Sequence, residues 1–342
     1  MNRKRVSIKD IAAIAGVSHP TVSRALRGEG RISDETRERV VAIAQDLGYT
    51  PNLVARGLVM QRTRSIGLVV TNIGDPFHAE IINGVEHVAQ TNEYSLFLGS
   101  TTASPDQEVR MVRSFHARNV DGIIIAAGQF GDRYAEVLDE IDMPIVLIST
   151  HSTNDALHSV THDDYGGAGQ IMAHLLDQGC RRIAYLGHFS GGRVDSERRD
   201  AWLDALKQAN LTPPVTVDVA VTTIDAGMNA VGPLLDKAER QWGQPPDAIF
   251  CYNDLLAIGV LSGLRQRGLR VPNDIAVAGF DGLEVTAHLD PPLTTMCQPR
   301  YAMGIRATEI LLDLLANNAT APPHEVQLRG ELLIRKSTMR GA

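Results

Sequence analysis

Residues 6–28 read VSIKDIAAIAGVSHPTVSRALRG and predict two short helices joined by a tight turn. Ser7, followed three residues later by Asp10, is typical of a helix start, because the serine hydroxyl can accept a hydrogen bond from a free backbone N–H. Apolar residues then recur at helical spacing until Gly16, where a positive φ costs little. Ser18 can cap the second helix, so the stretch predicts a helix-turn-helix.

A third helix is predicted from Ser33, which can act as its cap, to Gly48, which ends it. Asp34 and Glu35 lie at its amino end, where the helix dipole favours negative charge. Its apolar face carries Val40, Ile43, Ala44 and Leu47. Residues 1–49 are therefore expected to form an all-α head of three helices.

The outward side of the second helix carries groups that suit a DNA major groove. An arginine such as Arg24 can bind guanine O6 and N7 with two hydrogen bonds, and a small apolar group such as Pro20 can touch a thymine methyl. An ordinary three-helix bundle is the alternative for the spacing alone. The DNA contacts expected here are Ser18, His19, Pro20, Thr21, Ser23 and Arg24.

This stretch and its continuation at 31–58, RISDETRERVVAIAQDLGYTPNLVARGL, closely resemble the head of the lactose/galactose repressor (LacI/GalR) family. The resemblance implies a sequence-specific regulator of transcription, with a repressor as the first expectation, and not an enzyme. Such a protein binds double-stranded, pseudo-palindromic operator DNA as a homodimer, with one recognition helix in each half-site. Arg24 is then expected to read a guanine. Phosphate contacts, which position a head without specifying bases, are expected from Thr21, Arg31, Ser33 and Asn52.

Residues 50–64 predict a hinge and linker. Pro51 disfavours a helical conformation at Thr50, and the helix-like run 52–60 is too short to be stable alone in water. The resemblance implies that this run folds against the same run of a second subunit in the minor groove, where Leu58 wedges between base pairs. The alternative is that Leu58 anchors a linker to the body. The contacts expected in this segment are Asn52, Ala55, Arg56 and Leu58.

The chain has 342 residues and a formal net charge of −7, which alone would argue against a nucleic-acid partner. The charges are unevenly distributed, however. Residues 1–64 carry 12 Lys and Arg against 6 Asp and Glu, whereas residues 65–342 carry 21 against 34. A basic head on an acidic body confines the attraction for DNA to the head.

The three cysteines, Cys180, Cys251 and Cys297, are widely spaced and indicate neither a disulfide framework nor a zinc site, so no metal or cofactor is expected. The loop at 187–194 has two glycines at P-loop spacing but lacks the Lys and Ser/Thr that hold phosphate and Mg²⁺. The sequence has no GxSxG or HExxH motif, no signal peptide and no apolar run that would span a bilayer. A cytoplasmic protein is expected, without a membrane partner and associated with the nucleoid when it binds DNA.

From residue 65 the pattern changes to short apolar runs that alternate with amphipathic helices. Continuous apolar runs indicate strands covered on both faces, and hence a parallel α/β sheet. One set of runs lies near 66–70, 96–98, 122–125 and 145–148, with helices predicted near 77–91, 106–118 and 132–140. A second set lies near 183–187, 248–251 and 275–280, with helices near 196–209, 226–239 and 254–267. Two sets imply two lobes.

The resemblance extends over 65–338, which is similar to periplasmic sugar-binding proteins and implies three crossings of the chain between the lobes. These are expected near Asp163, at Asp290-Pro291-Pro292 and at Ala321-Pro322-Pro323. The expected fold is an all-α helix-turn-helix head plus an α/β periplasmic-binding-protein-like core of two parallel-sheet lobes at 65–342. The N-lobe would comprise about 65–162 and 292–322, and the C-lobe about 163–291 and 323–340.

Ligands of parallel sheets bind beyond the carboxyl ends of the strands, so the polar residues that follow each run are candidates for a site between the lobes. Acids, an amide and an arginine offer the acceptors and donors that a polyhydroxylated ligand requires, and a sugar or a derivative is the favoured effector. By position in the family, effector contact is implied for Asp75, Phe77, Asp163, Arg198, Asn253 and Asp281. His78 and Gln129 are further candidates. Asp254 fits a helix cap as well as a ligand contact, and Asp164 is interpreted as a cap.

One position departs from the family pattern. The family often places an aromatic platform for the ligand just before a Ser/Ala-Gly pair, and Thr222 stands at the corresponding position here. This departure leaves the ligand class open. The competing class for the whole protein is a solute-binding or sensor protein without DNA function, against which the basic head and the missing signal peptide argue.

Overall fold

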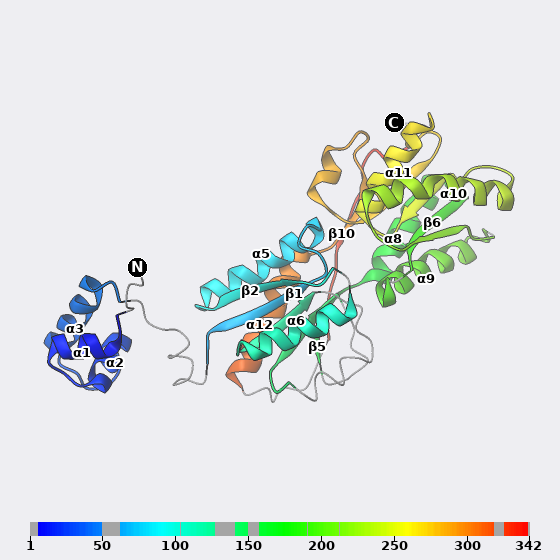
Figure 1. Cartoon of the computed structure of the whole chain (residues 1–342). Coiled ribbons are helices and arrows are strands. Elements are labelled where there is room, and N and C mark those ends of the chain that lie inside the picture. Colours follow the sequence, from blue (N-terminus) through cyan, green and yellow to red (C-terminus); the bar gives the residue numbers. More distant parts are fainter. Residues whose placement is uncertain are drawn as a thin grey trace. The chain divides into compact units, whose positions relative to one another are not determined.

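The computed structural model describes residues 6–49, 62–102, 104–126, 141–149, 157–189, 191–211, 213–317 and 325–340. The chain divides into two compact units, Met1–Thr63, here called the head, and Arg64–Ala342, here called the core (Figure 1). Five predicted site residues lie outside the described residues, namely Asn52, Ala55, Arg56, Leu58 and Gln129. The helix predicted near 132–140 lies outside them as well.

The head consists of α1 (Ile8–Ala15), α2 (His19–Arg27) and α3 (Asp34–Asp46). Each begins at the predicted serine. Ser7 forms a reciprocal capping box with Asp10, while the hydroxyls of Ser18 and Ser33 accept bonds from the third backbone N–H that follows each of them. Gly16 ends α1 with a φ of 66°. Local hydrogen bonding therefore defines every helix start of the head.

The core of the head is small and rich in alanine. Ile11, Val22 and Val40 are fully buried, one from each helix. Ala12, Ala15, Ala25 and Ala44 fill the space between them, which lets the three helices approach closely. The outward face of α2 is consequently left for other contacts.

The N-lobe is built on a six-stranded sheet whose strands are all parallel, in the order β11-β5-β4-β3-β1-β2. These strands are β1 (Ser65–Val70), β2 (Ser95–Ser100), β3 (Gly122–Ala126), β4 (Ile145–Ile148), β5 (His158–His162) and β11 (Glu325–Leu328). On one face lie α5 (Pro76–Thr91) and α12 (Arg300–Ala316), and on the other lies α6 (Pro105–Ala117). A Cβ on Gly84 of α5 would lie 2.2 Å from the carbonyl oxygen of Tyr301 in α12, so α5 and α12 pack with their backbones almost in contact.

The C-lobe repeats this plan with the strand order β12-β10-β9-β8-β6-β7, in which only β12 runs antiparallel to its neighbour. The strands are β6 (Ile183–His188), β7 (Thr216–Val219), β8 (Ala248–Cys251), β9 (Ala276–Asp281), β10 (Thr294–Cys297) and β12 (Glu331–Leu333). The helices α8 (Asp164–Asp177) and α9 (Gly192–Gln208) cover one face, and α10 (Ile224–Trp242) and α11 (Asp254–Gln266) cover the other. A short 3₁₀ helix, η1, spans Glu284–His288.

The chain crosses between the lobes three times, and two of the crossings differ from the predicted positions. The first follows β5 at Asp163, as predicted. The second follows β10 at about 298–299, because β10 still pairs within the C-lobe sheet, and the third lies at about 329–330, between β11 and β12. The prediction that the prolines at 290–292 mark a crossing is therefore wrong. Ala321-Pro322-Pro323, the other predicted crossing, lies outside the described residues, and the strand that follows it, β11, still belongs to the N-lobe sheet.

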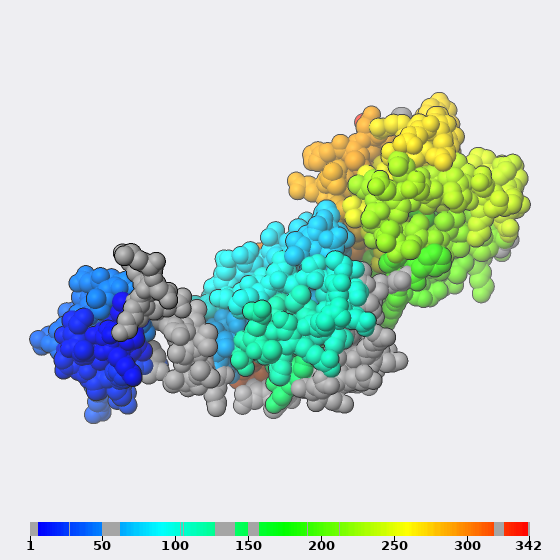
Figure 2. All heavy atoms as spheres, viewed as in Figure 1, coloured from blue at the N-terminus to red at the C-terminus, as the bar shows by residue number. Residues whose placement is uncertain are grey.

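The three crossings touch one another. Asp163 N donates to the Leu328 carbonyl oxygen at 3.1 Å, which joins the first crossing to the third. A Cβ on Gly330 would lie 2.3 Å from the Cys297 carbonyl oxygen and 2.6 Å from His162 Nε2. Only glycine fits there, so the lobes are joined by a closely packed triple connection. In the space-filling view, the blue and cyan surface of the N-lobe touches the green and yellow surface of the C-lobe (Figure 2).

No helix among the described residues combines the length and apolar character that crossing a lipid bilayer requires. No group of three or more His, Cys, Asp or Glu side chains within these ranges could hold a metal ion.

Candidate DNA-binding and effector sites

The α2 surface of the head carries the predicted DNA contacts at or near solvent. Ser18, His19, Pro20 and Arg24 are exposed, and Thr21 and Ser23 are half-buried. The Ser18 hydroxyl lies 2.9 Å from Thr21 Oγ1 and accepts a 3.4 Å bond from Thr21 N. Capping thus fixes the first turn of α2, and with it the direction in which the neighbouring exposed side chains project.

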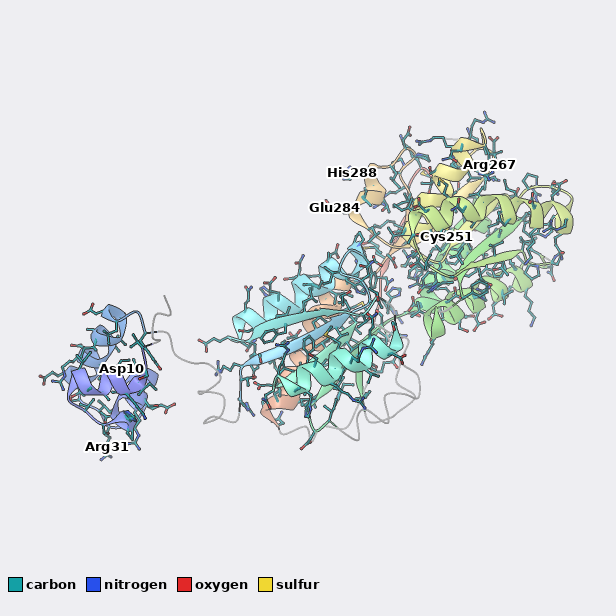
Figure 3. The ribbon with its side chains drawn as sticks, in the orientation of Figure 1. Asp10, Arg31, Cys251, Arg267, Glu284 and His288 are labelled. Carbon is teal, nitrogen blue, oxygen red and sulfur yellow. The ribbon has the colours of Figure 1, made fainter. Side chains whose placement is uncertain are left out.

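Arg24 and Arg31 are the exposed cations of this region. The stem of Arg24 passes over the turn after α2, where a Cβ on Gly30 would lie 3.3 Å from Arg24 Cδ. Arg31 lies at the surface of the head (Figure 3), and Ser33 is also exposed while it caps α3. The predicted DNA contacts that the structure describes thus lie on α2 and at the α2–α3 turn.

At the junction of the lobes, Arg198 of α9 is the central cation of the C-lobe. It is 3% exposed and forms an ion pair with Asp164, whose Oδ1 accepts a hydrogen bond from Arg198 Nε at 2.8 Å and lies 2.7 Å from Arg198 Nη2. Nη1 donates to the Tyr252 carbonyl oxygen at 2.6 Å. The guanidinium lies 3.7 Å from the centroid of the Phe280 ring and 4.8 Å from that of Tyr252. Arg198 is thereby held rigidly between two aromatic rings.

The helix cap predicted for Asp164 is made by its neighbour Asp163. Asp163 caps α8, accepting from Gly166 N at 2.9 Å, whereas Asp164 is buried and binds Arg198. The interpretation of Asp164 as the cap is therefore wrong. Burial would raise the pKa of Asp164, but Arg198 and His162 outweigh it, so the pKa lies below its ordinary value.

The pair at the start of α11 is arranged in the same way. Asn253 is the cap and accepts from Leu256 N at 3.0 Å, while Asp254 is fully buried behind it. Asp254 accepts from Leu283 N at 2.8 Å and from Thr295 Oγ1 at 2.6 Å. Burial raises the pKa of Asp254 to about 7. Asp254 therefore supports the turn after β9, and the capping interpretation applies to its neighbour.

Asp281, at the end of β9, has an unusual backbone. Its φ is 122°, in a region that favours glycine, and its side chain is 5% exposed. Gln298 Nε2 donates to Asp281 Oδ1 at 2.8 Å. Burial raises the pKa of Asp281 well above its ordinary value, and Asp254 and Asp75 add to this effect while Arg198 opposes it. Asp75 of the N-lobe therefore contributes to the electrostatic environment of Asp281.

The N-lobe side of the junction is formed by the start of α5. Asp75 caps this helix by accepting from Phe77 N at 2.9 Å, and both residues are half-buried. His78 is buried, with Nε2 2.8 Å from Thr71 Oγ1, and burial lowers its pKa while Asp75 opposes the shift. His78 therefore faces Thr71 in the interior, which favours a structural role over contact with a ligand.

Two residues of the second crossing were missed by the sequence prediction. Gln298 binds Asp281, as described above. Arg300 is 2% exposed and bridges the lobes, because its Nη2 donates to Glu80 Oε1 at 2.9 Å in the N-lobe and to the Gly282 carbonyl oxygen at 3.0 Å in the C-lobe. Both follow β10, so recognising that strand would have identified them.

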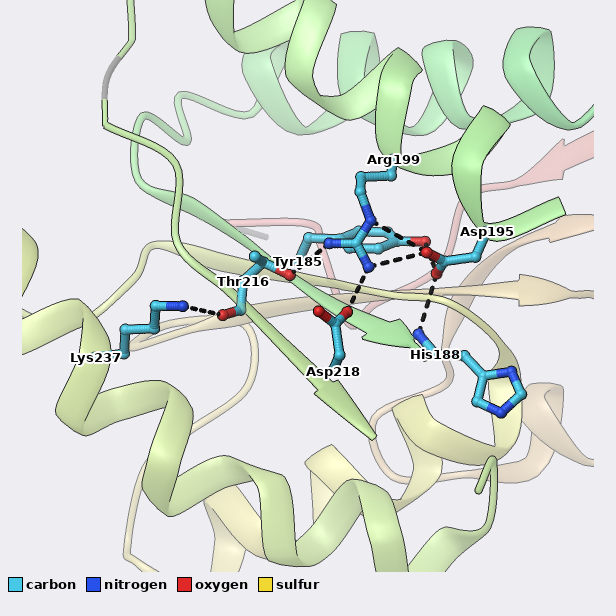
Figure 4. A network of polar contacts seen from close by, with 7 residues as sticks. All are labelled: Tyr185, His188, Asp195, Arg199, Thr216, Asp218 and Lys237. Carbon is cyan, nitrogen blue, oxygen red and sulfur yellow. Dashed lines mark hydrogen bonds and ion pairs between the residues drawn. The ribbon is translucent and has the colours of Figure 1, made fainter. Parts of the chain in front are cut away.

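A second polar network anchors α9 to the C-lobe sheet (Figure 4). Arg199 bonds to Asp195 Oδ2 at 2.9 Å, to Asp218 and to Thr216 Oγ1 at 3.0 Å. Asp195 Oδ1 also accepts from Tyr185 Oη and from His188 N. Since Arg198 directly precedes Arg199 in α9, this network helps to fix the position of Arg198.

The chain matches two family models. Residues 7–52 match "Bacterial regulatory proteins, lacI family", and residues 172–338 match "Periplasmic binding protein-like domain". Catabolite control protein A of Priestia megaterium is 32% identical over 337 residues, which cover 97% of this chain and 99% of that protein. The transcriptional repressor PurR of Mannheimia succiniciproducens is 31% identical over 336 residues, which cover 98% and 99%.

Solved structures agree with these relatives. The Lac repressor dimer bound to operator and the anti-inducer ONPF has a TM-score of 0.87 and 25% identity, over 98% of this chain and 100% of that one. A CelR–cellobiose complex has a TM-score of 0.73 and 30% identity, over 97% and 100%. The predicted fold class is thus confirmed, and relatives named as repressors support the prediction that the chain is not an enzyme. The chain belongs to the lacI family of bacterial regulatory proteins.

Proposed function

We propose that this regulator is a repressor that binds a pseudo-palindromic operator as a homodimer under the control of a small molecule held between its lobes. The observation that carries the proposal is that one chain combines an exposed α2 surface bearing Arg24 with a junction where Arg300 joins Glu80 of the N-lobe to Gly282, the neighbour of Asp281, in the C-lobe. The first suits a major groove, and the second suits a hydroxylated ligand.

In the head, Arg24 reads a guanine, and His19, Pro20 and Ser23 set the neighbouring positions. Ser18, Thr21, Arg31, Ser33 and Asn52 contact phosphates, which fix the register of the head on the duplex. Ala55, Arg56 and Leu58 enter the minor groove at the operator centre. The exposure of the α2 start and of Arg31 supports this assignment.

The homodimer is supported by the edge of the N-lobe sheet. Among the described strands, β2 pairs with β1 alone, and its residues Phe97 and Leu98 are 45% and 38% exposed. An exposed apolar edge strand favours association. The Lac repressor relative is a dimer on its operator, and a second copy of this chain is accordingly proposed as the partner. Such a DNA-bound dimer works in the cytoplasm, at the nucleoid.

The effector is proposed to be a sugar or a derivative. At the junction, the carboxylates of Asp75 and Asp281 can accept hydrogen bonds from ligand hydroxyls, and the guanidinium of Arg198 can donate to them. Strained backbone such as that of Asp281 is concentrated at ligand sites. The remaining proposed contacts are Phe77, Asp163, Asn253 and Gln129. Structures of relatives hold cellobiose and ribose, which supports this class.

Control requires that the effector bind two arrangements of the lobes unequally. Because three chain segments in the closely packed triple connection link the lobes, a ligand held by Asp75 on one side and Asp281 on the other changes the orientation of the two lobes relative to each other. In a dimer, this orientation sets the spacing of the two hinges, and the spacing decides whether they fold together on DNA.

The direct test combines a thermal-shift screen with footprinting on genomic fragments. The panel contains D-ribose, D-glucose, D-galactose, cellobiose, D-gluconate, D-glucose 6-phosphate and adenine. We expect one compound to raise the melting temperature, and a two-fold symmetric footprint whose affinity changes when that compound is added. A protein that binds a compound but no DNA would instead be a solute-binding sensor.

For base reading, Arg24→Ala is expected to weaken operator binding by about 1–3 kcal/mol and to relax the sequence preference at a single position of each half-site. The measurement is a gel shift on operators with each base pair changed in turn. Arg39→Ala, which removes an exposed arginine from α3, is the control and should leave the preference intact. An equal loss on every sequence for Arg24→Ala would show that Arg24 contacts phosphate.

A further inference from the structure

The largest exposure of a bulky apolar side chain among the described residues is at the carboxyl end of β6. Phe189 is 74% exposed there, and Val221 and Ile224, which follow β7, are 57% and 43% exposed. Phe189 N donates to the Val219 carbonyl oxygen at 3.0 Å, and His188 Nε2 donates to the Ala220 carbonyl oxygen at 3.2 Å. These bonds bring the segment after β6 beside the segment after β7.

This apolar surface, which we call the Phe189 wall, is continuous with the effector site. The His188 ring lies 5.5 Å from the Tyr252 ring, whose other neighbour is the Arg198 guanidinium. A Cβ on Gly191, on the far side of Phe189, would lie 3.3 Å from Tyr252 Cε2. The chain on both sides of Phe189 thus contacts the ring that borders Arg198.

The base of the wall is fixed before any ligand arrives. Asp195 Oδ1 accepts from His188 N at 3.1 Å, and Arg199 holds the other oxygen of the same carboxylate. Figure 4 shows the His188 ring projecting away from this network, beyond the end of β6. An aromatic side chain that is largely exposed to water and whose backbone is already fixed is suited to contact with a ligand. Less conformational entropy is lost on binding when the backbone is ordered beforehand.

We propose that Phe189, backed by Val221 and Ile224, is the surface on which the effector lays its ring, in place of the aromatic side chain that position 222 lacks. This inference rests on the proposed function and narrows its ligand class. The effector is a cyclic molecule with one apolar face, whose hydroxyls reach Arg198 and Asp281 at its edge while its C–H groups cover the Phe189 ring.

The test measures dissociation constants by calorimetry for wild type, Phe189→Ala, Phe189→Tyr and Leu203→Ala. Leu203, on the outer face of α9, is the matched control, because it is an exposed apolar residue of the same lobe. The probes are D-ribose and D-glucose, each beside its open-chain alditol, which keeps the hydroxyls but has no ring face, and cellobiose, which has two rings. Adenine and D-gluconate complete the set.

We expect Phe189→Ala to weaken the binding of the cyclic ligand by about three- to tenfold, as for the loss of one aromatic contact. Phe189→Tyr and Leu203→Ala should stay within about twofold of wild type. The preference for the ring over its alditol should shrink in Phe189→Ala, and operator affinity without ligand should not change.

Three results would overturn the inference while leaving the proposed function intact: equal affinity in Phe189→Ala, tighter binding of an open-chain compound than of any ring, or a change of operator affinity in the ligand-free Phe189→Ala protein. The last would assign the wall to a contact with another macromolecule. If no compound bound the wild type, the effector part of the proposed function would fail, and the wall with it.

Discussion

The two lobes have the same sheet order and similar helical layers, yet they prepare the junction differently. The C-lobe groups Arg198, Asp254 and Asp281 are at most 5% exposed and have hydrogen-bond partners within their own lobe or the second crossing. The N-lobe groups Asp75 and Phe77 are half-buried, and only the cap bond links them. The C-lobe half of the site is therefore built in advance, and the N-lobe half is left open for closure.

This difference has an energetic reason. A buried charge is tolerated only when its partners are fixed, and removing one partner strands the other. The C-lobe meets this condition with aromatic rings and backbone groups around Arg198. A half-site with solvent access keeps its side chains hydrated until the ligand replaces the water. The same fold thus provides one rigid and one adaptable surface.

The largest expected effect tests the rigid half. Arg198→Met should lower the free energy of unfolding by about 3–5 kcal/mol, because Asp164 is left charged and buried without its partner. Urea unfolding followed by circular dichroism measures it. Arg193→Met, which removes an exposed arginine of the same helix paired with Glu197, should cost at most about 1 kcal/mol. Equal losses in the two variants would contradict the comparison.

A smaller effect concerns pH: the contributions of Asp254 in the C-lobe and His78 in the N-lobe to the free energy of unfolding should change with pH in opposite directions. The raised pKa of Asp254 means that the folded state binds its proton more tightly, so the contribution of Asp254 to stability is lost as the pH rises from 3.8 towards 7. The lowered pKa of His78 works the other way, and its contribution is lost as the pH falls below 6.5. Each group can change the free energy of unfolding by at most about 1.4 kcal/mol per pH unit.

The measurement is the free energy of unfolding against pH for wild type, Asp254→Asn and His78→Gln. Subtracting each variant from wild type isolates one group, so the other titrating residues cancel. The slope is the quantity to compare, because Asp254→Asn also loses a hydrogen bond at every pH. Difference curves with the same sign would contradict the assignment.

The smallest effect on stability tests the open half. Asp75→Ala should cost only about 1 kcal/mol, the value of one helix cap, yet weaken effector binding by about tenfold or more. Ser104→Ala is the control, since Ser104 precedes α6 in the same lobe and makes no side-chain cap bond. Thermal melts and calorimetry with the hit of the screen provide both numbers. Wild-type affinity in Asp75→Ala would remove Asp75 from the site.

The head could be predicted closely from sequence because its signals are local. Ser7, Ser18 and Ser33 each cap within three residues, so the pattern contains both partners of the bond. The α/β alternation of the core is equally local. The helices α8 and α12 were not among the predicted ranges, however, and neither were the short strands β7, β10, β11 and β12.

The details of the site depended on contacts between distant segments. Which of Asp163 and Asp164 turns inward is decided by Arg198, 34 positions away from the latter. Gln298 and Arg300 became relevant only because β10 pairs with β9 and carries the second crossing past the prolines. Composition around Pro291 and Pro322 gives no information about such pairing.

The triple connection also bears on how such a regulator can be recombined. Each lobe is assembled from separated parts of the chain, since the N-lobe needs α12 and β11, and the C-lobe needs β12. A single cut in the gene between β1 and β12 therefore leaves at least one of the two sheets incomplete, and neither lobe is one continuous segment that could be moved alone. The head is a single continuous segment. A chimera with new operator specificity is obtained by exchanging the head at its linker, whereas a new ligand response has to arise by substitutions within an undivided core.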